Sequence, residues 1–418
     1  MDSISVCGGV RLQGKVRIQG SKNAALPILA ASLLTQGNNY IYNCPKISDV
    51  SAMQQLMKCL GCVVRTQSDL INIDATNIVR DDLPKEAVRE MRSSLCLLSV
   101  LLSRNGEVIM EYPGGCVIGA RPIDMHIAAL KCMGACFREK DDLIYASVPE
   151  GFHGADIHFE KVSVGATENV ILAAVLAEGI TTVRGAAKEP EVVALCEYLC
   201  ACGASIYGIG TDTVVIHGVK RLSGCSYTIP ADRIVAGTYL FAVLATGGNV
   251  LLERAPCNQM CAVLDPAEKM GGTCQVFEEG LYIQADGQVH NVARLRTDIY
   301  PGFPTDLQSV ALAVMACIPG ECLIEESIFE NRFHVVKPLQ KMGADIDIID
   351  TGHVRVRGVE RLMGEEIYAK ELRGAAALVV AGLSAEGKTL VHGGRYIMRG
   401  YENICRDLRE LGARVISV

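Results

Sequence analysis

The sequence predicts an α/β protein built from six similar repeats, because two series of glycines recur along its 418 residues at one spacing. Within each series the glycines lie about 70 residues apart. The first series is Gly61, Gly134, Gly203, Gly271, Gly343 and Gly412. The second is Gly37, Gly106, Gly179, Gly248, Gly320 and Gly387, each followed by a short run typical of a β-strand. Two helices with strands between and after them account for one repeat.

The stretch before each glycine of the first series has the pattern of an amphipathic helix. Counting back by 1, 4, 8 and 11 residues gives mostly apolar side chains, as at Leu60, Met57, Met53 and Val50, which is one face of a helix. His126 and Arg332 are the polar exceptions. A local exception in a regular pattern indicates a functional or strained site, and a polar residue that reaches the surface is the alternative.

The stretches before the second series are apolar on nearly all sides, as in residues 24–34, 95–102 and 375–383. Such helices are buried, and we expect the following glycines to be their C-caps. Counting back 14 or 15 residues from these glycines gives the expected helix starts at Lys22, Arg92, Gly165, Arg233, Asp306 and Arg373. Helix N-termini carry free N–H groups and a partial positive charge. Several helix starts gathered together with Lys and Arg side chains therefore predict a pocket for a multiply anionic ligand. Ordinary capping and solvation of helix ends is the alternative.

The repeats divide three and three, which predicts two domains with the main boundary at 230–232. The first domain is expected at 22–231, and the second at 1–21 together with 232–418. Strands expected at 5–7 and 16–18 precede the first helix, and we expect them to pair with the C-terminal half, which ends in a strand at 414–418. The chain then connects the domains twice, as a hinge over a cleft requires.

Composition excludes several classes of protein. Half of the residues are apolar, which suffices for two large cores. The chain has no apolar run of membrane-spanning length and no basic segment of a secretory signal, so a cytoplasmic protein is expected. A net charge of −7 without a basic aromatic stripe argues against nucleic-acid binding. The histidines and cysteines lack zinc spacing, and no metal is predicted.

The eighteen cysteines are expected on apolar helix faces rather than in disulfides. Cys59 and Cys62 have the spacing of a redox pair, but Cys62 takes a repeat position that alanine holds elsewhere, so core packing is the interpretation. Cys116 is the exception, because it lies in segment 112–122 with three glycines and two prolines, a composition typical of a mobile lid. Positive charge from Arg121, Lys22 and Arg92 would favour its thiolate. A surface cysteine on a linker is the alternative.

Six motifs give the chain an end-to-end resemblance to a known family. They are Gly-Ser-Lys-Asn-Ala-Ala-Leu-Pro at 20–27, the loop from 113 to 126, Lys-Val-Ser-Val-Gly-Ala-Thr at 161–167, Phe-Pro-Thr-Asp at 303–306, Phe-Glu-Asn-Arg-Phe at 329–333 and Arg-Gly-Tyr-Glu at 399–402. With them the chain resembles the UDP-N-acetylglucosamine 1-carboxyvinyltransferases, a branch of the enolpyruvyl transferases. The resemblance implies an inside-out α/β barrel of two three-repeat domains, with the active site in the interdomain cleft.

The resemblance also implies a reaction and its residues. The enolpyruvyl group of phosphoenolpyruvate would pass to the 3-hydroxyl of UDP-N-acetylglucosamine with release of phosphate, the committed step of peptidoglycan precursor synthesis, and no cofactor is implied. The implied phosphoenolpyruvate-binding residues are Lys22, Asn23, Arg121 and Arg399. The implied sugar-nucleotide-binding residues are Arg92, Arg121, Pro122, Ile123, Asp124, Met125, Lys161, Ser163, Val164, Gly165, Asp306 and Ile328. Arg332 and Arg373 match arginines near the cleft.

The reaction requires two proton-handling groups. Asp306 is expected to accept the proton of the sugar hydroxyl, and Cys116 to donate one to C3 of phosphoenolpyruvate. Lys22, Arg121 and Arg399 would stabilise the charge that redistributes. A covalent adduct of Cys116 is treated as a side or resting state. Glu371 stands where aspartate is common, and we expect its longer side chain still to reach the cleft.

Two alternatives remain open. A 3-phosphoshikimate 1-carboxyvinyltransferase shares the fold but lacks a lid cysteine in a Pro-Gly-Gly-Cys setting. A non-catalytic relative, acting as a regulator or binding module, should have lost Cys116, Asp306 or an anion-binding arginine, and this chain retains all of them.

Overall fold

The structure is a computed structural model that describes residues 2–78, 92–112, 119, 122–141, 143–286 and 288–418. The chain forms two compact units. The N-terminal unit comprises Gly20 to Pro230 apart from 117–119, and the C-terminal unit comprises the chain up to Gln19 together with Ala231 to Val418. Each unit has its own cluster of buried apolar side chains.

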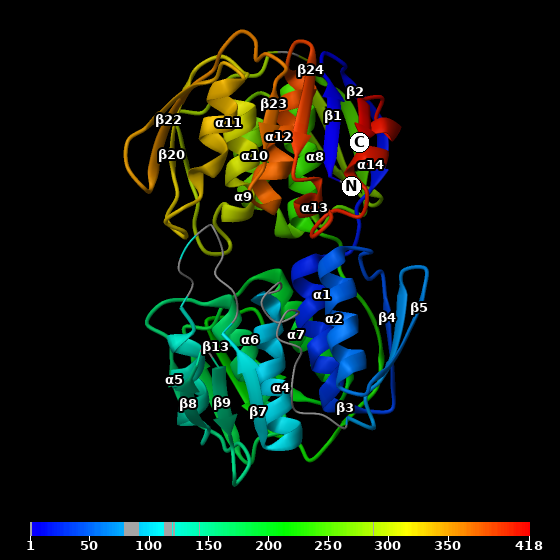
Figure 1. The fold of residues 1–418 in the computed structure, drawn as a ribbon, viewed down its shortest axis with the longest axis vertical. Coiled ribbons are helices and arrows are strands. Elements are labelled where there is room, and N and C mark those ends of the chain that lie inside the picture. The colour runs from blue at the N-terminus through cyan, green and yellow to red at the C-terminus, as the bar shows by residue number, and fades with distance from the viewer. Residues whose placement is uncertain (1, 79–91, 113–118, 120–121, 142, 287) are drawn as a thin grey trace. The chain divides into compact units, whose positions relative to one another are not determined.

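In the described part of the N-terminal unit, three of the helices correspond to the predicted buried stretches. They are α1 (Lys22–Ala31), α4 (Cys96–Asn105) and α6 (Val164–Ala174), and Figure 1 labels them. α1 packs against α4, and α4 packs against α6. The other α-helices among the described residues of this unit are α2 (Ser48–Cys59), α5 (Asp124–Cys132) and α7 (Pro190–Ala201), with 3₁₀ turns η1 (Ser32–Leu34) and η2 (Arg92–Leu95).

The C-terminal unit has a corresponding set of helices. The buried ones are α8 (Arg233–Thr246), α10 (Thr305–Met315) and α12 (Leu372–Ser384), and each packs against the other two. α8 and α10 approach closely at Gly237, where an added Cβ would lie 2.4 Å from Leu307 Cδ1. The remaining helices are α9 (Cys261–Lys269), α11 (Val336–Lys341), α13 (Gly394–Ile397) and α14 (Ile404–Glu410), with η3 (Cys257–Gln259) and η4 (Phe333–Val335).

The glycine series mark the helices as predicted at their starts but only partly at their ends. Lys22, Arg92 and Arg233 are the first residues of α1, η2 and α8, and Gly165, Asp306 and Arg373 are the second residues of α6, α10 and α12. Of the second glycine series, only Gly106 is a helix C-cap. The C-cap prediction is wrong for the other five, because their helices end two or more residues before the glycine. All six adopt positive φ there, which glycine does without steric cost.

The strands of the N-terminal unit form four sheets. Two are four-stranded, with orders β10-β11-β13-β12 and β15-β4-β6-β5, one has the order β7-β9-β8, and β14 pairs with β3. Their bounds are β3 (Thr35–Gln36), β4 (Asn38–Tyr42), β5 (Val63–Gln67), β6 (Leu70–Asp74), β7 (Glu107–Glu111), β8 (Cys136–Lys140), β9 (Leu143–Ser147), β10 (Asp156–His158), β11 (Ile180–Arg184), β12 (Ser205–Tyr207), β13 (Thr213–His217), β14 (Leu222–Ser223) and β15 (Ser226–Thr228).

The C-terminal unit has three four-stranded sheets, with orders β17-β18-β16-β2, β19-β20-β22-β21 and β23-β24-β1-β25. Their bounds are β1 (Ser3–Cys7), β2 (Leu12–Arg17), β16 (Gly248–Glu253), β17 (Thr273–Phe277), β18 (Gly280–Ala285), β19 (Arg294–Arg296), β20 (Glu321–Glu325), β21 (Asp345–Ile348), β22 (His353–Arg357), β23 (Glu366–Tyr368), β24 (Lys388–His392) and β25 (Arg414–Ser417). Each four-stranded sheet in the two units combines one parallel pair with two antiparallel pairs.

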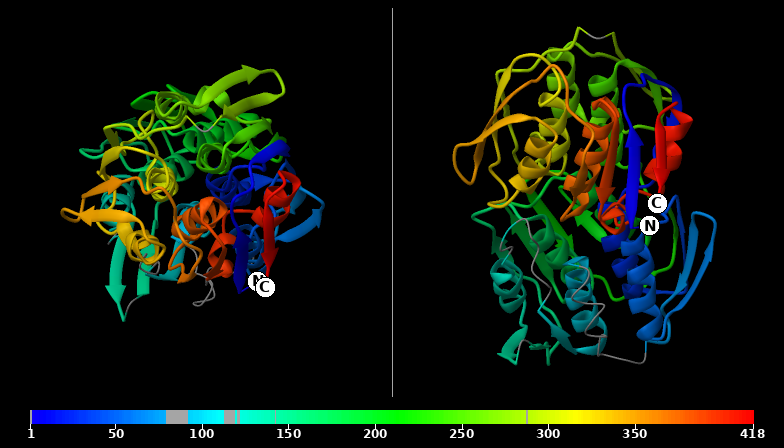
Figure 2. Two further views of the ribbon diagram at one scale, coloured as in Figure 1. Left: turned by 90° about the horizontal axis from the view of Figure 1, so that it is seen from above. Right: turned by 45° about the horizontal axis from the view of Figure 1, so that its top comes forward.

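The N-terminal strands join the C-terminal half, as predicted. β1 lies between β24 and β25 and is antiparallel to both, and Figures 1 and 2 show it in blue between the orange and red strands. β2 pairs with β16 in another sheet. The C-terminal unit therefore contains strands from both the N-terminal and the C-terminal parts of the sequence.

The cysteines are less uniformly packed than the sequence suggests. Cys62 is buried, which confirms its interpretation as core packing. Cys59, Cys132, Cys136 and Cys261 are exposed, so the expectation that all cysteines except Cys116 are packed is wrong for these four. They lie on strands or outward helix faces, where half of the side chains meet water. None of the helices that the structure describes has the length and apolar character needed to cross a membrane.

Candidate active site

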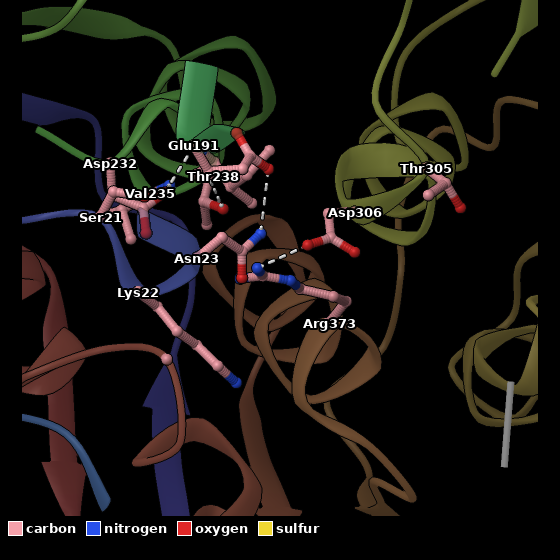
Figure 3. A network of polar contacts seen from close by, with 12 residues as sticks. Ser21, Lys22, Asn23, Glu191, Asp232, Val235, Thr238, Thr305, Asp306 and Arg373 are labelled. Carbon is pink, nitrogen blue, oxygen red and sulfur yellow. Dashed lines mark hydrogen bonds and ion pairs between the residues drawn. The ribbon is translucent and has the colours of Figure 1, made fainter. Parts of the chain in front are cut away.

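Asp306 lies between two buried arginines at the start of α10. Its Oδ1 is 2.6 Å from Arg332 Nη2, and its Oδ2 is 2.7 Å from Arg373 Nη2. Figure 3 shows the Arg373 contact. The arginine side chains are 2% and 5% exposed, whereas that of Asp306 is 28% exposed. Two buried cations therefore hold a carboxylate that remains accessible.

Arg373 has an unusual environment for a cation. Burial by itself lowers the pKa of its guanidinium, but the negative charge of Asp306 raises the pKa above its ordinary value, and Tyr401 and Asp232 act in the same direction. Its Nη1 has no hydrogen-bond partner among the residues that the structure describes. Buried donors normally have partners, and a guanidinium matches carboxylate or phosphate best. This position is therefore suited to an anionic ligand.

The starts of α8 and α12 are capped by carboxylates. Asp232 accepts hydrogen bonds from the backbone N–H groups of Ile234 and Val235 at 2.8 and 3.1 Å. Glu371 accepts from the backbone N–H groups of Arg373 and Gly374. The Glu371 side chain thus caps its own helix, and the expectation that it reaches the cleft stays a prediction. The free N–H groups of a helix start offer this carboxylate strong partners. Its Oε2 also lies 3.7 Å from Arg332 Nη1.

A buried carboxylate, Glu326, fixes the segment that carries Ile328. Its Oε1 accepts hydrogen bonds from the backbone N–H groups of Ile328 and Phe329 at 2.8 and 3.1 Å, and its Oε2 accepts one from Thr305 Oγ1 at 2.9 Å. Arg332 Nε donates to the carbonyl of Thr305 at 3.3 Å. The start of α10 and the segment 326–332 are thus held together by polar contacts.

The start of α1 in the N-terminal unit is also polar. Lys22 Nζ lies 2.7 Å from Asp49 Oδ2, and both side chains are largely buried. Asn23 Nδ2 donates to Glu191 Oε1 at 3.5 Å, and Figure 3 shows Asn23 and Glu191 facing each other. Ser21 caps the helix by accepting from the N–H of Ala24. An anion at this helix start would meet a lysine whose charge Asp49 partly balances.

The start of α6 is built around a glycine that packs against a histidine. Ser163 caps the helix, and His126 from α5 is buried. A Cβ on Gly165 would lie 2.8 Å from His126 Nε2, closer than such contacts normally allow. His126, one of the two exceptions in the amphipathic pattern, is therefore a buried neighbour of a predicted sugar-nucleotide-binding residue. Arg332, the other exception, is the buried partner of Asp306.

We expect Gly165→Ala to destabilise the protein, because the new Cβ would collide with the buried His126 ring. Overpacking of this kind typically costs about 1–3 kcal/mol of unfolding free energy. Thermal unfolding of Gly165→Ala, His126→Ala and the double variant would measure it. The loss should be smaller in the His126→Ala background, and an equal loss in both backgrounds would contradict the collision.

The remaining predicted site residues lie in a variety of environments. Arg92, Met125, Ile328 and Arg399 are half-buried, Ile123 is buried, and Pro122, Asp124 and Lys161 are exposed. Val164 is the half-buried first residue of α6. Cys116, Arg121 and most of the predicted lid lie outside the described residues. The sequence patterns did not single out Asp49, Glu191 or Glu326. Asp49 and Glu191 are acidic residues in the first turns of α2 and α7, which is the signal that could have identified them.

The sequence of the whole chain matches known enzymes. The family model described as EPSP synthase (3-phosphoshikimate 1-carboxyvinyltransferase) matches residues 6–408. The chain is 41% identical to the enzyme named UDP-N-acetylglucosamine 1-carboxyvinyltransferase 2 of Caldanaerobacter subterraneus, and the alignment covers 100% of both chains. The chain belongs to the UDP-N-acetylglucosamine 1-carboxyvinyltransferase family. Relatives of that name from Saccharophagus degradans (42%) and Staphylococcus epidermidis (40%, copy 1) also match over the full length of both chains.

Solved structures support the α/β fold of this carboxyvinyltransferase family. The enolpyruvyl transferase NikO from Streptomyces tendae superposes with a TM-score of 0.89 at 23% identity, covering 99% of this chain and 98% of the other. EPSP synthase from Acinetobacter baumannii superposes with a TM-score of 0.76 at 17% identity over 100% of both chains. The predictions of an α/β enzyme and of a carboxyvinyltransferase are confirmed.

In a carboxyvinyltransferase with this network, we expect Arg373→Lys to lower turnover at least about tenfold, since a hydrogen bond between charged groups contributes roughly 1.5–3 kcal/mol. Lysine keeps the positive charge, but it lacks the planar guanidinium group that can contact Asp306 and a ligand at the same time. Steady-state kinetics would give kcat and KM. Arg357→Lys is the matched control, because Arg357 also pairs with carboxylates, those of Glu321, Asp345 and Asp347, but its side chain is 39% exposed. Equal losses in both variants would contradict a specific role for Arg373.

Proposed function

We propose that this protein transfers the enolpyruvyl group of phosphoenolpyruvate to the 3-hydroxyl of UDP-N-acetylglucosamine and releases phosphate, as the committed step of peptidoglycan precursor synthesis. The observation that carries the proposal is the 41% identity, over both full chains, to a relative named for this acceptor. The EPSP synthase structure shares the fold at only 17% identity. Shikimate 3-phosphate is therefore the weaker candidate acceptor.

Asp306 is proposed as the general base. Attack of the sugar hydroxyl on C2 of phosphoenolpyruvate requires an acceptor for the hydroxyl proton, and an ionised carboxylate is one. The Asp306 side chain is 28% exposed, which supports access for a substrate hydroxyl. Its contacts with two guanidinium groups favour the ionised carboxylate and fix its orientation. Pro304, not Asp306, is the N-cap of α10, and both carboxylate oxygens of Asp306 are held by guanidinium groups. A role in the reaction explains its position better than a role in capping.

The anionic groups of the substrates are proposed to bind at helix starts. Lys22, Asn23, Arg121 and Arg399 would hold the carboxylate and phosphate of phosphoenolpyruvate, while Lys161, Ser163, Val164 and Gly165 would meet the diphosphate of the sugar nucleotide. The position of Lys22 and Asn23 in the first turn of α1, and of Ser163 as the N-cap of α6, supports this assignment. Arg92, Pro122, Ile123, Asp124, Met125 and Ile328 would contact the rest of the nucleotide sugar.

Cys116 is proposed to protonate C3 of phosphoenolpyruvate. This role rests on the family resemblance, since Cys116 lies outside the described residues. Protonation at C3 and attack at C2 give a tetrahedral ketal, which then loses phosphate together with a proton from C3 and so restores the carbon–carbon double bond. Electrostatic stabilisation of the phosphate and carboxylate by Lys22, Arg121 and Arg399 would lower the barrier.

The finer architecture is proposed together with the function. We propose that each unit contains three copies of one repeat in the inside-out α/β arrangement of the family. The strand pairing shared by the five four-stranded sheets, and the three buried helices of each unit, support it. Two further statements stay predictions. The active site is expected in a cleft between domain 22–231 and the domain formed by 1–21 together with 232–418. The protein is expected in the cytoplasm.

The proposed reaction can be tested by phosphate release. The purified protein is mixed with phosphoenolpyruvate and either UDP-N-acetylglucosamine, shikimate 3-phosphate or no acceptor, and phosphate is measured over time. We expect release only with UDP-N-acetylglucosamine, together with a product whose mass exceeds that of the acceptor by the added carboxyvinyl group. Release with shikimate 3-phosphate alone would support the alternative enzyme. No release with either acceptor, from folded protein, would support a non-catalytic relative.

A further inference from the structure

Two thiols of the N-terminal unit, Cys202 and Cys225, lie in direct contact. Their Sγ atoms are 3.2 Å apart, with Cys202 donating its S–H to Cys225. Cys202 is the buried C-cap residue of α7, and Cys225 is partly exposed one residue before β15. Neither residue belongs to the proposed catalytic or substrate-binding set. The contact therefore needs a separate explanation.

Backbone hydrogen bonds hold the two segments side by side. The carbonyl of Cys202 accepts from the N–H of Ser223 at 2.9 Å, and the N–H of Cys202 donates to the carbonyl of Tyr198 at 3.0 Å. Asn39 Oδ1 accepts both the Tyr198 hydroxyl at 2.7 Å and the N–H of Cys225 at 3.3 Å. A disulfide bond is about 2.05 Å long, so the sulfur atoms need to approach by little more than 1 Å. Small side-chain rotations can supply this approach without moving the anchored backbone.

The two thiols differ in their readiness to ionise. The hydrogen bond from Cys202 lowers the pKa of Cys225, whereas the contact with Cys225, together with burial, raises the pKa of Cys202. The C-terminal end of a helix carries partial negative charge, which also favours the protonated form of Cys202. By contrast, burial raises the pKa of Cys62 to about 11 and that of Cys322 to about 12. Cys225 thus combines partial exposure with a favoured thiolate, the combination that makes a thiol reactive.

We propose that Cys202 and Cys225 form a reversible intramolecular disulfide when the protein meets a peroxide. The Cys225 thiolate attacks an oxygen of hydrogen peroxide, the O–O bond breaks, and a sulfenic acid and one water form after proton transfer. The Cys202 sulfur then attacks the sulfenic sulfur, forms the S–S bond and releases a second water. Both sulfur atoms are oxidised and the peroxide is reduced. A small thiol such as dithiothreitol reverses the change by thiol–disulfide exchange.

The disulfide would join the end of α7 to the segment that enters β15. That strand pairs with β4 and is followed by Ile229 and Pro230, the last residues of the N-terminal unit. A cross-link between these segments restricts the unfolded chain more than the folded one. We therefore expect the oxidised protein to unfold at a higher temperature than the reduced protein, and the shift to disappear in Cys225→Ala.

The linkage can be mapped directly in the wild-type protein. The protein is treated with a small excess of hydrogen peroxide, its remaining thiols are alkylated, and it is digested with trypsin. Cleavage after Lys188, Lys220, Arg221 and Arg233 places Cys202 in peptide 189–220 and Cys225 in peptide 222–233. We expect these two peptides to appear as one cross-linked species, lighter than their sum by two hydrogen atoms, which dithiothreitol separates. Fragmentation of the species should assign the bond to Cys202 rather than to Cys196 or Cys200.

Variants separate this bond from general oxidation. The cross-link should vanish in Cys202→Ala and in Cys225→Ala, and persist in Cys257→Ala, which removes another partly exposed thiol. Because peptide mapping is the readout, oxidation of Cys116 does not affect the result. Alkylation of both Cys202 and Cys225 under conditions that oxidise the exposed Cys59 would overturn the proposal. A cross-link from Cys225 to a different cysteine would also overturn it.

Discussion

Asp306→Asn is expected to lower kcat by about 10² or more, because asparagine cannot accept the proton of the attacking hydroxyl. The substitution keeps the size of the side chain and the oxygen that faces one arginine. Binding of UDP-N-acetylglucosamine should be largely retained if Asp306 acts mainly as a base. Steady-state kinetics and calorimetric titration with the sugar nucleotide would measure the two effects separately.

The ion pairs of Asp306 require a control for structure. In the asparagine variant the amide NH₂ would face Arg332 or Arg373, so that two hydrogen-bond donors would meet. Part of the loss of turnover can then arise because the arginines are displaced. Removing one partner of a buried ion pair typically costs about 3–5 kcal/mol. Thermal unfolding therefore accompanies the kinetics, with the exposed Asp298→Asn as the matched control. Near-normal turnover in a stable Asp306→Asn protein would remove Asp306 from the mechanism.

The positions of the site residues along the helices were predictable from local signals. Apolar runs mark buried helices, and a glycine shortly after each run sets the register, which locates Lys22, Asp306 and Arg373 in first turns. These signals are local because φ preferences and helical periodicity act over a few residues. The glycines mark the ends less well, because a helix followed by a turn leaves the same sequence pattern as a helix ended by its cap.

The contacts of those residues were not predictable, because they join segments far apart in the sequence. Asp306 meets Arg332, which lies 26 residues later, and Arg373, which lies 67 residues later. The pairing of Lys22 with Asp49 depends on the packing of α1 against α2. Cys202 and Cys225 are close in sequence, but their contact depends on how Asn39 anchors both segments. In each case, tertiary packing selects partners from many residues with the same chemistry.

Replacement of Cys116 should have the largest effect on turnover and distinguishes two mechanisms. We expect Cys116→Ala to remove nearly all turnover, because alanine can neither donate a proton to C3 nor add to C2. Cys116→Asp should retain substantial turnover, since a carboxylic acid can donate a proton but is a poor substitute for a thiol nucleophile. The acid must be protonated to act, and a carboxyl loses its proton at lower pH than a thiol. The pH optimum of Cys116→Asp should therefore shift downward.

An epoxide that mimics phosphoenolpyruvate provides an independent measure of the same thiol. Fosfomycin should alkylate Cys116 selectively, because the proposed anion site would deliver it and the positive charge predicted beside Cys116 would favour the thiolate. Mass spectrometry should find the adduct in the wild type and in Cys59→Ala, which removes an exposed thiol, but in neither variant of Cys116. An inactive Cys116→Asp protein that still folds and binds UDP-N-acetylglucosamine would favour obligatory covalent catalysis. Retained turnover together with resistance to the epoxide would assign Cys116 to proton donation, because a carboxylic acid shares with the thiol only the capacity to supply a proton.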